Sequence, residues 1–588
     1  MGTRHGSRPA CPPENARIAK MAKTACLAVS AFLTFLAPPG HAEERATLDR
    51  PYDPVVIPCS SLQGLLGTPV EDIRICAYRA SEGRWEGIPF QLDERKAIVD
   101  PWDPPNLRLS YFDPDDGLLD ADDELCFLCR DAGDRAGPSD WPDLPGCRAF
   151  ARVELELYDP LDGGRAWVYA YRCSGQGPPI PAPYCLSYDA AHDEVSSVAY
   201  RVRLGANTGL VEDVAILPPF GSGVDFFDTQ KIRMVGLLTA FNLTLPFGRD
   251  WSPYAANERD NLFIYPDSTR WTLRPVVRVV RQALQAVRFG AFVFGDARFP
   301  VETKFYPFFG RVSGGTDLST LGELVDVEVD LLRQSWDFNA NAVGMRLSTR
   351  RNRELRIDGV PDAFDSRVDL PIREWFLVTG EQGSLFVRLA LVDTIGTSQS
   401  LYYRDDRNGG QSHGTLVHGG DTGYDGASYG DVGVLATGRV ARPNLQLDFA
   451  AYFLPADQPP GAGERLAAWL GTPVTVAATT QAPSGVAASA RGVLLPDAVE
   501  LSAAFPNPFR VVTSFRVWLE GPGEVVVQVV DVAGRRVRLL HQGSLPHGGR
   551  EFRWDGRDDD GAALPSGRYF VMVRAGGQVR TRPVVLLR

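Results

Sequence analysis

Lysine is nearly missing from this chain of 588 residues: it occurs only at Lys20, Lys23, Lys96, Lys231 and Lys304. Arginine supplies nearly all of the positive charge, which we interpret as a genomic composition bias and not as a functional patch. Acidic residues exceed basic ones, and the formal net charge at pH 7 is -12. Because neutralising phosphates requires a basic face, this charge argues against a general nucleic-acid binder.

The common catalytic motifs are also missing. The chain shows no Ser-His-Asp order, phosphate loop, HExxH motif or Rossmann glycine pattern. Isolated carboxylate pairs such as Asp93-Glu94 are too common to be taken as the acid and base of a glycosidase. After residue 42, no apolar segment is long enough to span a bilayer.

The N-terminus has the anatomy of a secretory signal peptide. The basic residues Arg17, Lys20 and Lys23 precede the uncharged apolar run Ala25–Leu36. Small residues at Gly40 and Ala42 then form a cleavage pattern. We therefore expect export with cleavage after residue 42 and no transmembrane span afterwards, and translation that starts at Met21 is an alternative to a start at Met1.

Cysteine usage agrees with export. The mature chain keeps seven cysteines, all in its first third, and in an oxidising compartment they are disulfide candidates: Cys59, Cys76, Cys126, Cys129, Cys147, Cys173 and Cys185. Since seven is odd, at least one should stay free. Cys126 and Cys129 have metal or redox spacing, but on a strand these positions point to opposite faces, so we favour a structural role over zinc.

The composition and periodicity predict an all-β protein. Glycine (58) and proline (45) are plentiful, as expected for many short strands joined by turns. The length requires several cores. We expect a signal peptide, a cysteine-containing β-rich domain, a large β-sandwich domain, a small-residue linker and an Ig-like domain, at residues 1–42, 43–190, 191–481, 482–497 and 498–588.

In the central region, three local patterns define the expectations. Residues 325–330 alternate Val with Asp or Glu, which is typical of a half-buried antiparallel strand. The β-branched residues of 275–287 favour a strand over a helix. Residues 375–378 and 385–392 flank a Gly-rich turn and predict a hairpin, and the best helix is short, over 462–470.

The strongest metal candidate is a run of carboxylates around an Asp-Gly turn, made of Asp113, Asp115, Asp116, Asp120, Asp122, Asp123 and Glu124. Such crowding is what a hard cation such as Ca²⁺ prefers. Set against the EF-hand pattern, Phe112 and Pro114 occupy positions where oxygen ligands belong. The alternative, which these departures favour, is an acidic solvated turn before a strand at 125–128.

A second acidic and Gly-rich stretch runs from Tyr403 to Asp431 and contains His413 and His418. Carboxylates, histidines and aromatic residues on a long loop are compatible with a ligand site. A surface loop without a ligand is the alternative that we favour.

The last ninety residues are the most regular part of the chain. Glycine turns separate short strand candidates, which predicts an Ig-like sandwich. The strand candidates are 513–519, 524–532, 536–540, 550–554, 568–574 and 581–587. The residues that we expect to define its core and turns are Trp554, Asp555, Gly556, Gly567 and Tyr569, with Phe515 and Val571 as further core residues.

Several motifs in this segment occur in a specific order: FPNPF at 505–509, VDVAGRRV at 530–537, WDGRD at 554–558 and PSGRYF at 565–570. In this respect the segment resembles the Ig-like domain of the flagellar hook-cap protein (FlgD-like), a family that overlaps the type IX secretion C-terminal sorting domain. The resemblance covers about 90 residues. It implies a module for secretion or surface anchoring, with the secretion machinery or a cell-surface anchor as its partner, and it says little about the other domains.

Two functional hypotheses remain. The first is a non-catalytic bacterial protein on the cell surface or in the extracellular space that binds a glycan or matrix. The second is a secreted carbohydrate-active enzyme, a hydrolase or lyase, on a large β-sandwich. We favour the first because the sequence shows no catalytic constellation.

Overall fold

The computed structural model describes residues 44–588 except 100–106, 114–115, 143–151, 174–177, 179, 181–183, 207, 241–242, 249–263, 273–274, 290–291, 318–324, 370–373, 392–397, 409–427, 442–443, 482–491, 495–498, 502–508, 520–522, 532–534, 546–547, 560 and 576–577. The predicted signal peptide and most of the predicted linker lie outside these residues. Within the described part the chain is built almost entirely of strands, in eight sheets, as the sequence predicts.

The N-terminal region packs a three-stranded sheet, ordered β1-β7-β4, against a six-stranded sheet, ordered β29-β28-β8-β9-β2-β3. Alternate apolar residues of both sheets meet in a shared core that includes Ile57, Phe127 and Leu155. A separate hairpin joins β5 and β6. The elements are β1 (Pro54–Pro58), β2 (Ile73–Arg79), β3 (Arg84–Gly87), β4 (Phe90–Asp93), β5 (Lys96–Val99), β6 (Leu107–Ser110), β7 (Glu124–Leu128), β8 (Arg152–Tyr158), β9 (Arg165–Arg172), β28 (Thr475–Gln481) and β29 (Gly492–Leu494) with the 3-10 turns η2 (Cys59–Ser61), η3 (Val70–Asp72) and η4 (Cys129–Asp131).

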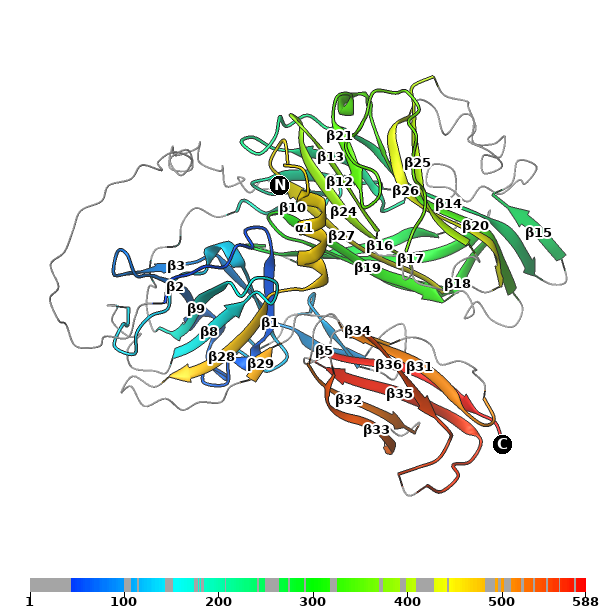
Figure 1. Ribbon diagram of the computed structural model, residues 1–588. Coiled ribbons are helices and arrows are strands. Elements are labelled where there is room, and N and C mark those ends of the chain that lie inside the picture. Colours follow the sequence, from blue (N-terminus) through cyan, green and yellow to red (C-terminus); the bar gives the residue numbers. More distant parts are fainter. Residues whose placement is uncertain are drawn as a thin grey trace, which may run out of the picture.

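Strand β28 departs from the expected domain boundaries. It pairs antiparallel with β8 along its whole length, from Thr475↔Tyr158 to Gln481↔Arg152. Figure 1 shows β28, in gold, inside the blue and cyan sheet of the N-terminal region. Residues 475–481 therefore belong to that sheet and not to the central sandwich, and residues 492–494, expected in the linker, form a strand paired with β28.

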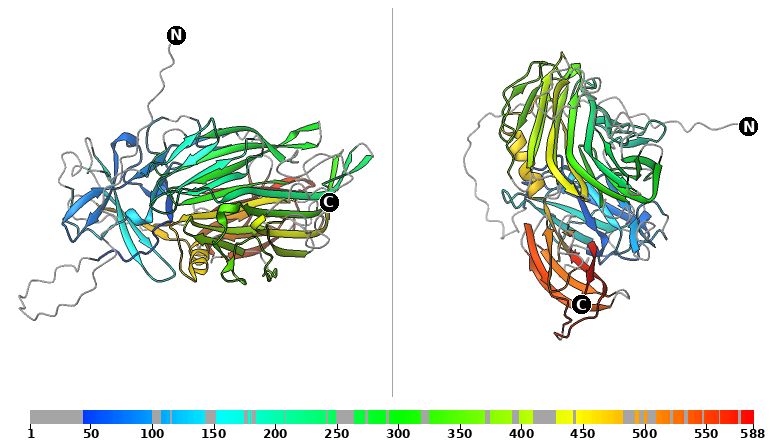
Figure 2. Two further views of the ribbon diagram at one scale, coloured as in Figure 1. Left: turned by 90° about the horizontal axis from the view of Figure 1, so that it is seen from above. Right: turned by 90° about the vertical axis from the view of Figure 1, so that its right-hand side faces the viewer.

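The central region, residues 184–472, contains a four-stranded sheet (β10-β11-β12-β13), a five-stranded sheet (β15-β14-β20-β26-β25) and a nine-stranded sheet (β16-β17-β18-β19-β27-β24-β23-β21-β22). Figure 2 shows the long strands as stacked layers. The strands are β10 (Ser187–Asp189), β11 (Glu194–Ser196), β12 (Tyr200–Leu204), β13 (Val211–Ile216), β14 (Phe227–Ala240), β15 (Leu243–Phe247), β16 (Ile264–Trp271), β17 (Val279–Phe289), β18 (Phe292–Phe305), β19 (Phe309–Asp317), β20 (Val325–Phe338), β21 (Arg346–Thr349), β22 (Leu355–Arg356), β23 (Glu374–Gly380), β24 (Gly383–Leu391), β25 (Ser398–Asp406), β26 (Ser428–Ala441) and β27 (Asn444–Leu454).

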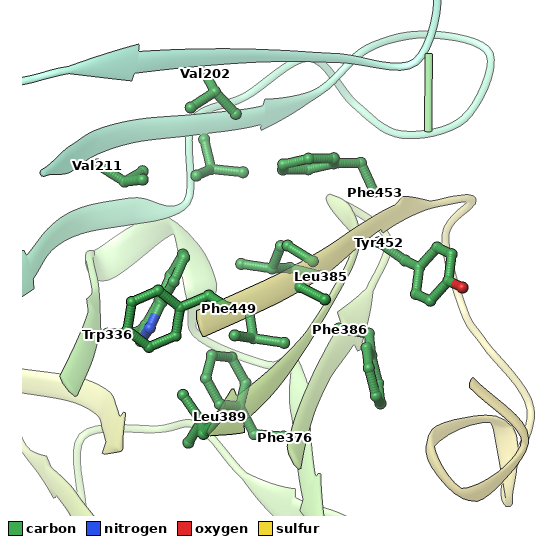
Figure 3. Close-up of a cluster of buried hydrophobic side chains, with 14 of the residues drawn as sticks. Val202, Val211, Trp336, Phe376, Leu385, Phe386, Leu389, Phe449, Tyr452 and Phe453 are labelled. Atoms are coloured by element: carbon green, nitrogen blue, oxygen red, sulfur yellow. The ribbon is translucent and has the colours of Figure 1, made fainter. Parts of the chain in front are cut away.

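One large apolar core joins these sheets. Trp336 of β20, Phe376 of β23 and Phe449 of β27 meet in it, with Trp336 and Phe376 ring centroids 6.0 Å apart (Figure 3). The predicted strand at 325–330 and the predicted hairpin, β23–β24, are confirmed. The strand predicted over 275–287 is also present, but it runs from Val279 to Phe289. Helix α1 (Ala462–Gly471) confirms the predicted helix, and a 3-10 turn, η6, spans Ala340–Ala342.

The C-terminal region is a sandwich of a three-stranded sheet (β30-β31-β34) and a four-stranded sheet (β33-β32-β35-β36). Figure 1 shows it in orange and red beside the rest of the chain. Every buried residue of its core lies between Val499 and Leu586. The strands are β30 (Val499–Leu501), β31 (Thr513–Leu519), β32 (Gly523–Val530), β33 (Arg536–Leu545), β34 (Gly548–Trp554), β35 (Gly567–Ala575) and β36 (Gln578–Leu586).

The expected core of this sandwich is largely confirmed. Trp554 is 1% exposed and Tyr569 is 5% exposed, and their rings meet edge to face at 5.3 Å. Gly556 has a positive φ of 72°, as the predicted turn requires. Asp555 is an exception, because it is exposed and its carboxylate accepts a hydrogen bond from the Arg557 N–H in the same turn.

Candidate functional site

The acidic stretch at residues 113–124 forms a turn whose carboxylates bond to the protein itself. Asp123 accepts hydrogen bonds from the N–H groups of Arg95 (2.9 Å) and Asp120 (2.7 Å). Asp116 accepts one from the N–H of Leu118 at 2.9 Å. Asp115 lies outside the described residues, and among those described no group of three or more His, Cys, Asp or Glu has the arrangement to hold a metal ion. A calcium site here remains a prediction.

Glu124, the last residue of this stretch, joins the N-terminal region to the central region. Its carboxylate lies 2.8 Å from Nη1 of the fully buried Arg278 and accepts a hydrogen bond from Tyr111 Oη at 2.9 Å. Arg95 Nη1 approaches it at 2.6 Å. Burial alone would raise the pKa of Glu124, but the charges of Arg278, Lys304 and Arg95 outweigh it and lower the pKa to about 2.

Gln91 adds a second connection at the same place. Its Oε1 accepts hydrogen bonds from three successive N–H groups, those of Val276, Val277 and Arg278, at 2.9, 3.2 and 3.1 Å. One side chain of β4 thus binds the backbone that leads into β17. Because the bonds from Val277 and Arg278 are buried, separating the two regions would leave buried polar groups unsatisfied.

A further buried ion cluster joins the two regions around Arg50. Its guanidinium binds Asp159 in a bidentate way, at 2.6 and 2.7 Å, and donates to Asp53 at 3.0 Å. Asp53 in turn accepts from Tyr452 Oη of β27 at 2.5 Å. We interpret these clusters as joints that hold the N-terminal and central regions together.

The five-stranded sheet of the central region carries a different kind of cluster, which we take as the candidate functional site. One face of this sheet packs into the large apolar core through Met234, Trp336 and Val434. The residues that alternate with these along each strand point to the opposite face of the sheet and carry buried polar side chains. We call this surface the polar face; it consists of Thr229, Lys231 and Arg233 on β14, Arg333, Ser335 and Asp337 on β20, Tyr402, Arg404 and Asp406 on β25, and Ser428 and Asp431 on β26.

Lys231 and Asp337 form the centre of the polar face. Their Nζ and Oδ2 atoms are 2.7 Å apart, and the second carboxylate, Asp431, lies 3.7 Å from the same Nζ. Ser428 Oγ donates to Asp337 Oδ1 at 2.9 Å. Lys231, Asp337 and Asp431 are each at most 2% exposed. Burying each ionised group costs several kcal/mol of desolvation free energy. An apolar sandwich core would be stable without such a cluster.

Two neighbours extend this centre. Arg333 lies with its guanidinium 4.9 Å from the ring centroid of Tyr402 and donates to its hydroxyl at 3.3 Å. Arg404 lies 3.9 Å from the carboxylate of Asp406. Ser335 of β20 pairs with Lys231 of β14 on one side and with Gly433 of β26 on the other. Its side chain is 0% exposed, and its Oγ has no hydrogen-bond partner.

Burial decreases along the polar face toward one end. On β26, Asp431 is 0% exposed and Leu435 is 6% exposed, whereas Thr437 is half-buried. Leu435 belongs to a small apolar cluster with Val235 and Leu331, against which the half-buried Tyr402 packs. The charged centre therefore lies at the closed end of a face whose other end reaches solvent.

The second acidic stretch of the sequence is connected to this site. Its described ends are the last residues of β25 and the first of β26, with Asp406 paired to Ser428 and Arg404 to Asp431. Asp405 faces the other way, where it accepts hydrogen bonds from the N–H groups of Asp358 and Gly359, and burial raises its pKa to about 6. His413 and His418 lie outside the described residues.

The cysteines divide into two groups. Cys59, Cys76, Cys126 and Cys129 are free and buried, so for these four the expected disulfides are wrong. Cys173 and Cys185 are disulfide-bonded, and Cys147 is outside the described residues. Cys126 packs into the large central core and Cys129 into the N-terminal core, so the two point apart as their spacing predicts. Burial raises the pKa of the Cys126 thiol to about 12.

The polar face could not be recognised from the sequence. Its charged residues alternate with apolar ones, which is also the pattern of an ordinary strand with one face in solvent. One signal was present: a lysine, one of only five, stands within a 14-residue strand that also carries Arg233. The pairing of β14 with β20 and β26 is what brings Lys231, Asp337 and Asp431 together.

The C-terminal region is thus an Ig-like sandwich with its own apolar core. Residues 512–578 match the family model described as the FlgD Ig-like domain, which confirms the FlgD-like prediction. Two curated relatives, the basal-body rod modification proteins FlgD of Salmonella typhimurium and Salmonella typhi, are 33% identical over 99 residues. That alignment covers 16% of this chain and 43% of each relative, so the chain spans less than half the length of the relatives it matches.

Solved structures show weak similarity to larger parts of the chain. They include dimeric latent PorU from Porphyromonas gingivalis, with 13% identity, a TM-score of 0.15 and coverage of 61% of this chain and 34% of that one. A copper-containing benzylamine oxidase from Hansenula polymorpha has 9% identity, a TM-score of 0.24 and coverage of 67% and 79%. PorZ, a surface component of the type IX secretion system of Porphyromonas gingivalis, has 12% identity, a TM-score of 0.12 and coverage of 68% and 51%. TM-scores this low carry no argument about function.

In the part of the chain that the structure describes, no helix is long and apolar enough to cross a membrane.

Proposed function

We propose that this chain is an exported bacterial protein of the cell surface or extracellular space, in which the C-terminal Ig-like domain serves secretion or anchoring and the remaining regions bind a ligand without catalysis. The observation that carries the proposal is the C-terminal domain itself. It matches the FlgD Ig-like family, and its apolar core contains only its own residues. A domain that closes its own core can act as a module attached to an independent body.

Two further features support export. The N-terminal sequence has the order of a signal peptide: basic residues, an apolar run and small residues at the cleavage position. The C-terminal motifs that resemble the type IX sorting domain would supply a second export signal, in addition to the signal peptide. The secretion machinery or a surface anchor is then the partner of residues 498–588.

Fractionation of cells that express the full chain and a chain without residues 498–588 tests the proposal. We expect the full chain at the surface or in the medium, and the truncated chain folded but retained in the periplasm. N-terminal sequencing of the exported chain should begin at Glu43. Arrival of the truncated chain at the normal destination would contradict the anchoring role, and a mature N-terminus upstream of Lys23 would contradict the signal peptide.

A secreted carbohydrate-active enzyme is the second candidate function. The observation in its favour is the polar face, where Arg333 and Tyr402 lie on the same face as the carboxylates of Asp337 and Asp431. Arginine, tyrosine and carboxylates together are compatible with hydrolase or lyase chemistry. Release of oligosaccharides from a polysaccharide panel by the full chain would support this function over simple binding.

A further inference from the structure

We propose that the folded chain forms an intramolecular amide (isopeptide) bond between Nζ of Lys231 and Cγ of Asp337, with Asp431 as the carboxylate that transfers the protons. The bond cross-links β14 and β20, two neighbouring strands of the five-stranded sheet. This inference concerns a covalent modification of the central region and does not depend on the proposed export or anchoring role. Three observations lead to it: the contact between the two reacting groups, their burial, and the position of a second carboxylate.

The first observation is the contact between the reacting groups. Lys231 pairs with Ser335 in the β14–β20 register, and Asp337 stands two residues further along β20 on the same face. The lysine side chain spans this diagonal, so that its Nζ lies 2.7 Å from Oδ2 of Asp337. The carboxyl carbon is one covalent bond beyond that oxygen. Groups that a fold holds in this way react as if at effective concentrations of about 10⁵–10⁸ M.

The second observation is the burial of both groups. Lys231 is 1% exposed and Asp337 is 2% exposed. The lysine nitrogen is a nucleophile only as the neutral amine, which forms when the ammonium passes a proton to the carboxylate beside it. Because a buried ion pair keeps little of its hydration, this proton transfer is less costly here than in water. Exclusion of water also protects the finished amide from hydrolysis.

The third observation is the second carboxylate and a hydroxyl donor. Asp431 of β26 is 0% exposed and lies 3.7 Å from the same Nζ. It is placed to accept a proton from Nζ during the attack and to pass it to the oxygen that leaves. Ser428 Oγ donates a hydrogen bond to Oδ1 of Asp337 at 2.9 Å. This donor stabilises the negative charge that Oδ1 gains in the tetrahedral intermediate, while Oδ2 leaves.

The reaction balances without a further reactant. The Nζ–Cγ bond forms and the Cγ–Oδ2 bond breaks. Oδ2 leaves as water and takes two of the three protons that the ammonium of Lys231 carried, and the third proton stays on the amide nitrogen. Nothing is oxidised or reduced, and Asp431 returns to its initial state.

The composition of the chain gives this bond a role. No cysteine follows Cys185, so no disulfide can link the strands from β14 to β27. Arginine replaces lysine nearly everywhere in this chain, and it would serve a buried ion pair equally well. Only lysine can form the amide, since arginine stays protonated. The bond closes a loop between residues 106 positions apart, which stabilises the fold by restricting the unfolded chain.

Intact-mass spectrometry of the reduced and denatured mature chain, residues 43–588, tests the bond. We expect a mass lower than that of the sequence by one water molecule. Trypsin should fail to cleave after Lys231, because its Nζ is acylated. The digest should therefore contain a branched peptide in which residues 204–233 are joined to residues 334–346. The full sequence mass together with separate, unlinked peptides would overturn the inference.

Three variants test the assigned residues. Lys231→Arg keeps the charge but cannot form the amide, so it should show the full mass and no branched peptide. Lys304→Arg is the matched control: Lys304 pairs with Glu302 at 3.3 Å at a partly exposed site, and this variant should keep the lower mass. Asp431→Asn should slow bond formation roughly a hundredfold or more, the usual contribution of a proton-transferring group.

These variants separate the roles of the two residues. The lower mass in Lys231→Arg would contradict the bond at Lys231. Bond formation at an unchanged rate in Asp431→Asn would contradict the proton-transfer role of Asp431.

Discussion

Arg278 of the central region donates a hydrogen bond from Nε to Oδ2 of Asp93 in the N-terminal region at 2.9 Å, and the side chains are 0% and 9% exposed. The two residues are 185 positions apart in the sequence. With Glu124 and Gln91, this pair places a fully buried guanidinium at the junction of two sheets. We therefore expect loss of this contact to destabilise both regions.

Replacing Asp93 with alanine tests this dependence. The substitution leaves Arg278 buried with one carboxylate fewer, and breaking a buried pair in this way costs about 3–5 kcal/mol. We expect a lower urea midpoint for the full chain. Glu82→Ala, at the exposed pair with Arg84, is the control and should leave the midpoint nearly unchanged. Similar midpoints for the two variants would show that the buried pair does not join the regions.

The depressed pKa of Glu124 predicts a specific loss of stability in acid. Its pKa is about 2 in the folded chain against an ordinary value of 4.5, so the unfolded state takes up the proton first as the pH falls. The stabilisation is complete above about pH 4.5 and is lost between there and about pH 2. The difference in unfolding free energy between the unchanged chain and Glu124→Gln should shrink across this window. A constant difference for Glu124→Gln would contradict the ion cluster.

The local sequence patterns were sufficient to predict the strands, but not to predict which strands pair with each other. The Val and Asp alternation at 325–330, the β-branched run before Phe289 and the glycine turns after residue 498 all predict strands that the structure contains. Alternation reports that one face of a strand is buried, and it contains no information on which strand lies beside it. Strand β28 pairs with β8 across 317 positions, so no local signal placed it in the N-terminal sheet.

The same limit applies to the candidate site. The sequence drew attention to the stretch from Tyr403 to Asp431, and its two ends do reach the polar face. Lys231 and Asp337 come from two other strands, and only the sheet register brings their charges within 2.7 Å. A charged residue that alternates with apolar ones looks the same whether its face meets solvent or other side chains.

Calcium at residues 113–124 is tested by chelation. An ion that binds only the folded chain stabilises it by mass action, so excess chelator should lower the melting temperature of the full chain and added CaCl₂ should restore it. The double variant Asp116→Asn with Asp120→Asn should lose this sensitivity. An unchanged melting curve with and without chelator would contradict a calcium site and leave the acidic turn, whose carboxylates Asp116 and Asp123 already accept backbone hydrogen bonds.

The C-terminal sandwich gives the sharpest prediction about stability, and it concerns Trp554. The indole ring is 1% exposed, lies 5.3 Å from the rings of both Phe509 and Tyr569, and donates from Nε1 to the carbonyl of Arg557 at 3.0 Å. The domain contains no cysteine, so packing alone must stabilise it. Removing such a ring leaves a cavity and costs on the order of 3–5 kcal/mol.

A loss of that size is comparable with the whole stability of a small domain, so Trp554→Ala should unfold residues 498–588 near room temperature. Circular dichroism of the isolated domain during thermal unfolding measures this. Phe570→Ala is the matched control: Phe570 lies on the half-buried outer side of the same strand as Tyr569, so its loss should cost much less. In cells, full chains with Trp554→Ala should be mislocalised like the truncated chain, because the anchoring module is unfolded. A cooperative transition of Trp554→Ala at the temperature of the unchanged domain would show that this ring does not hold the sandwich together.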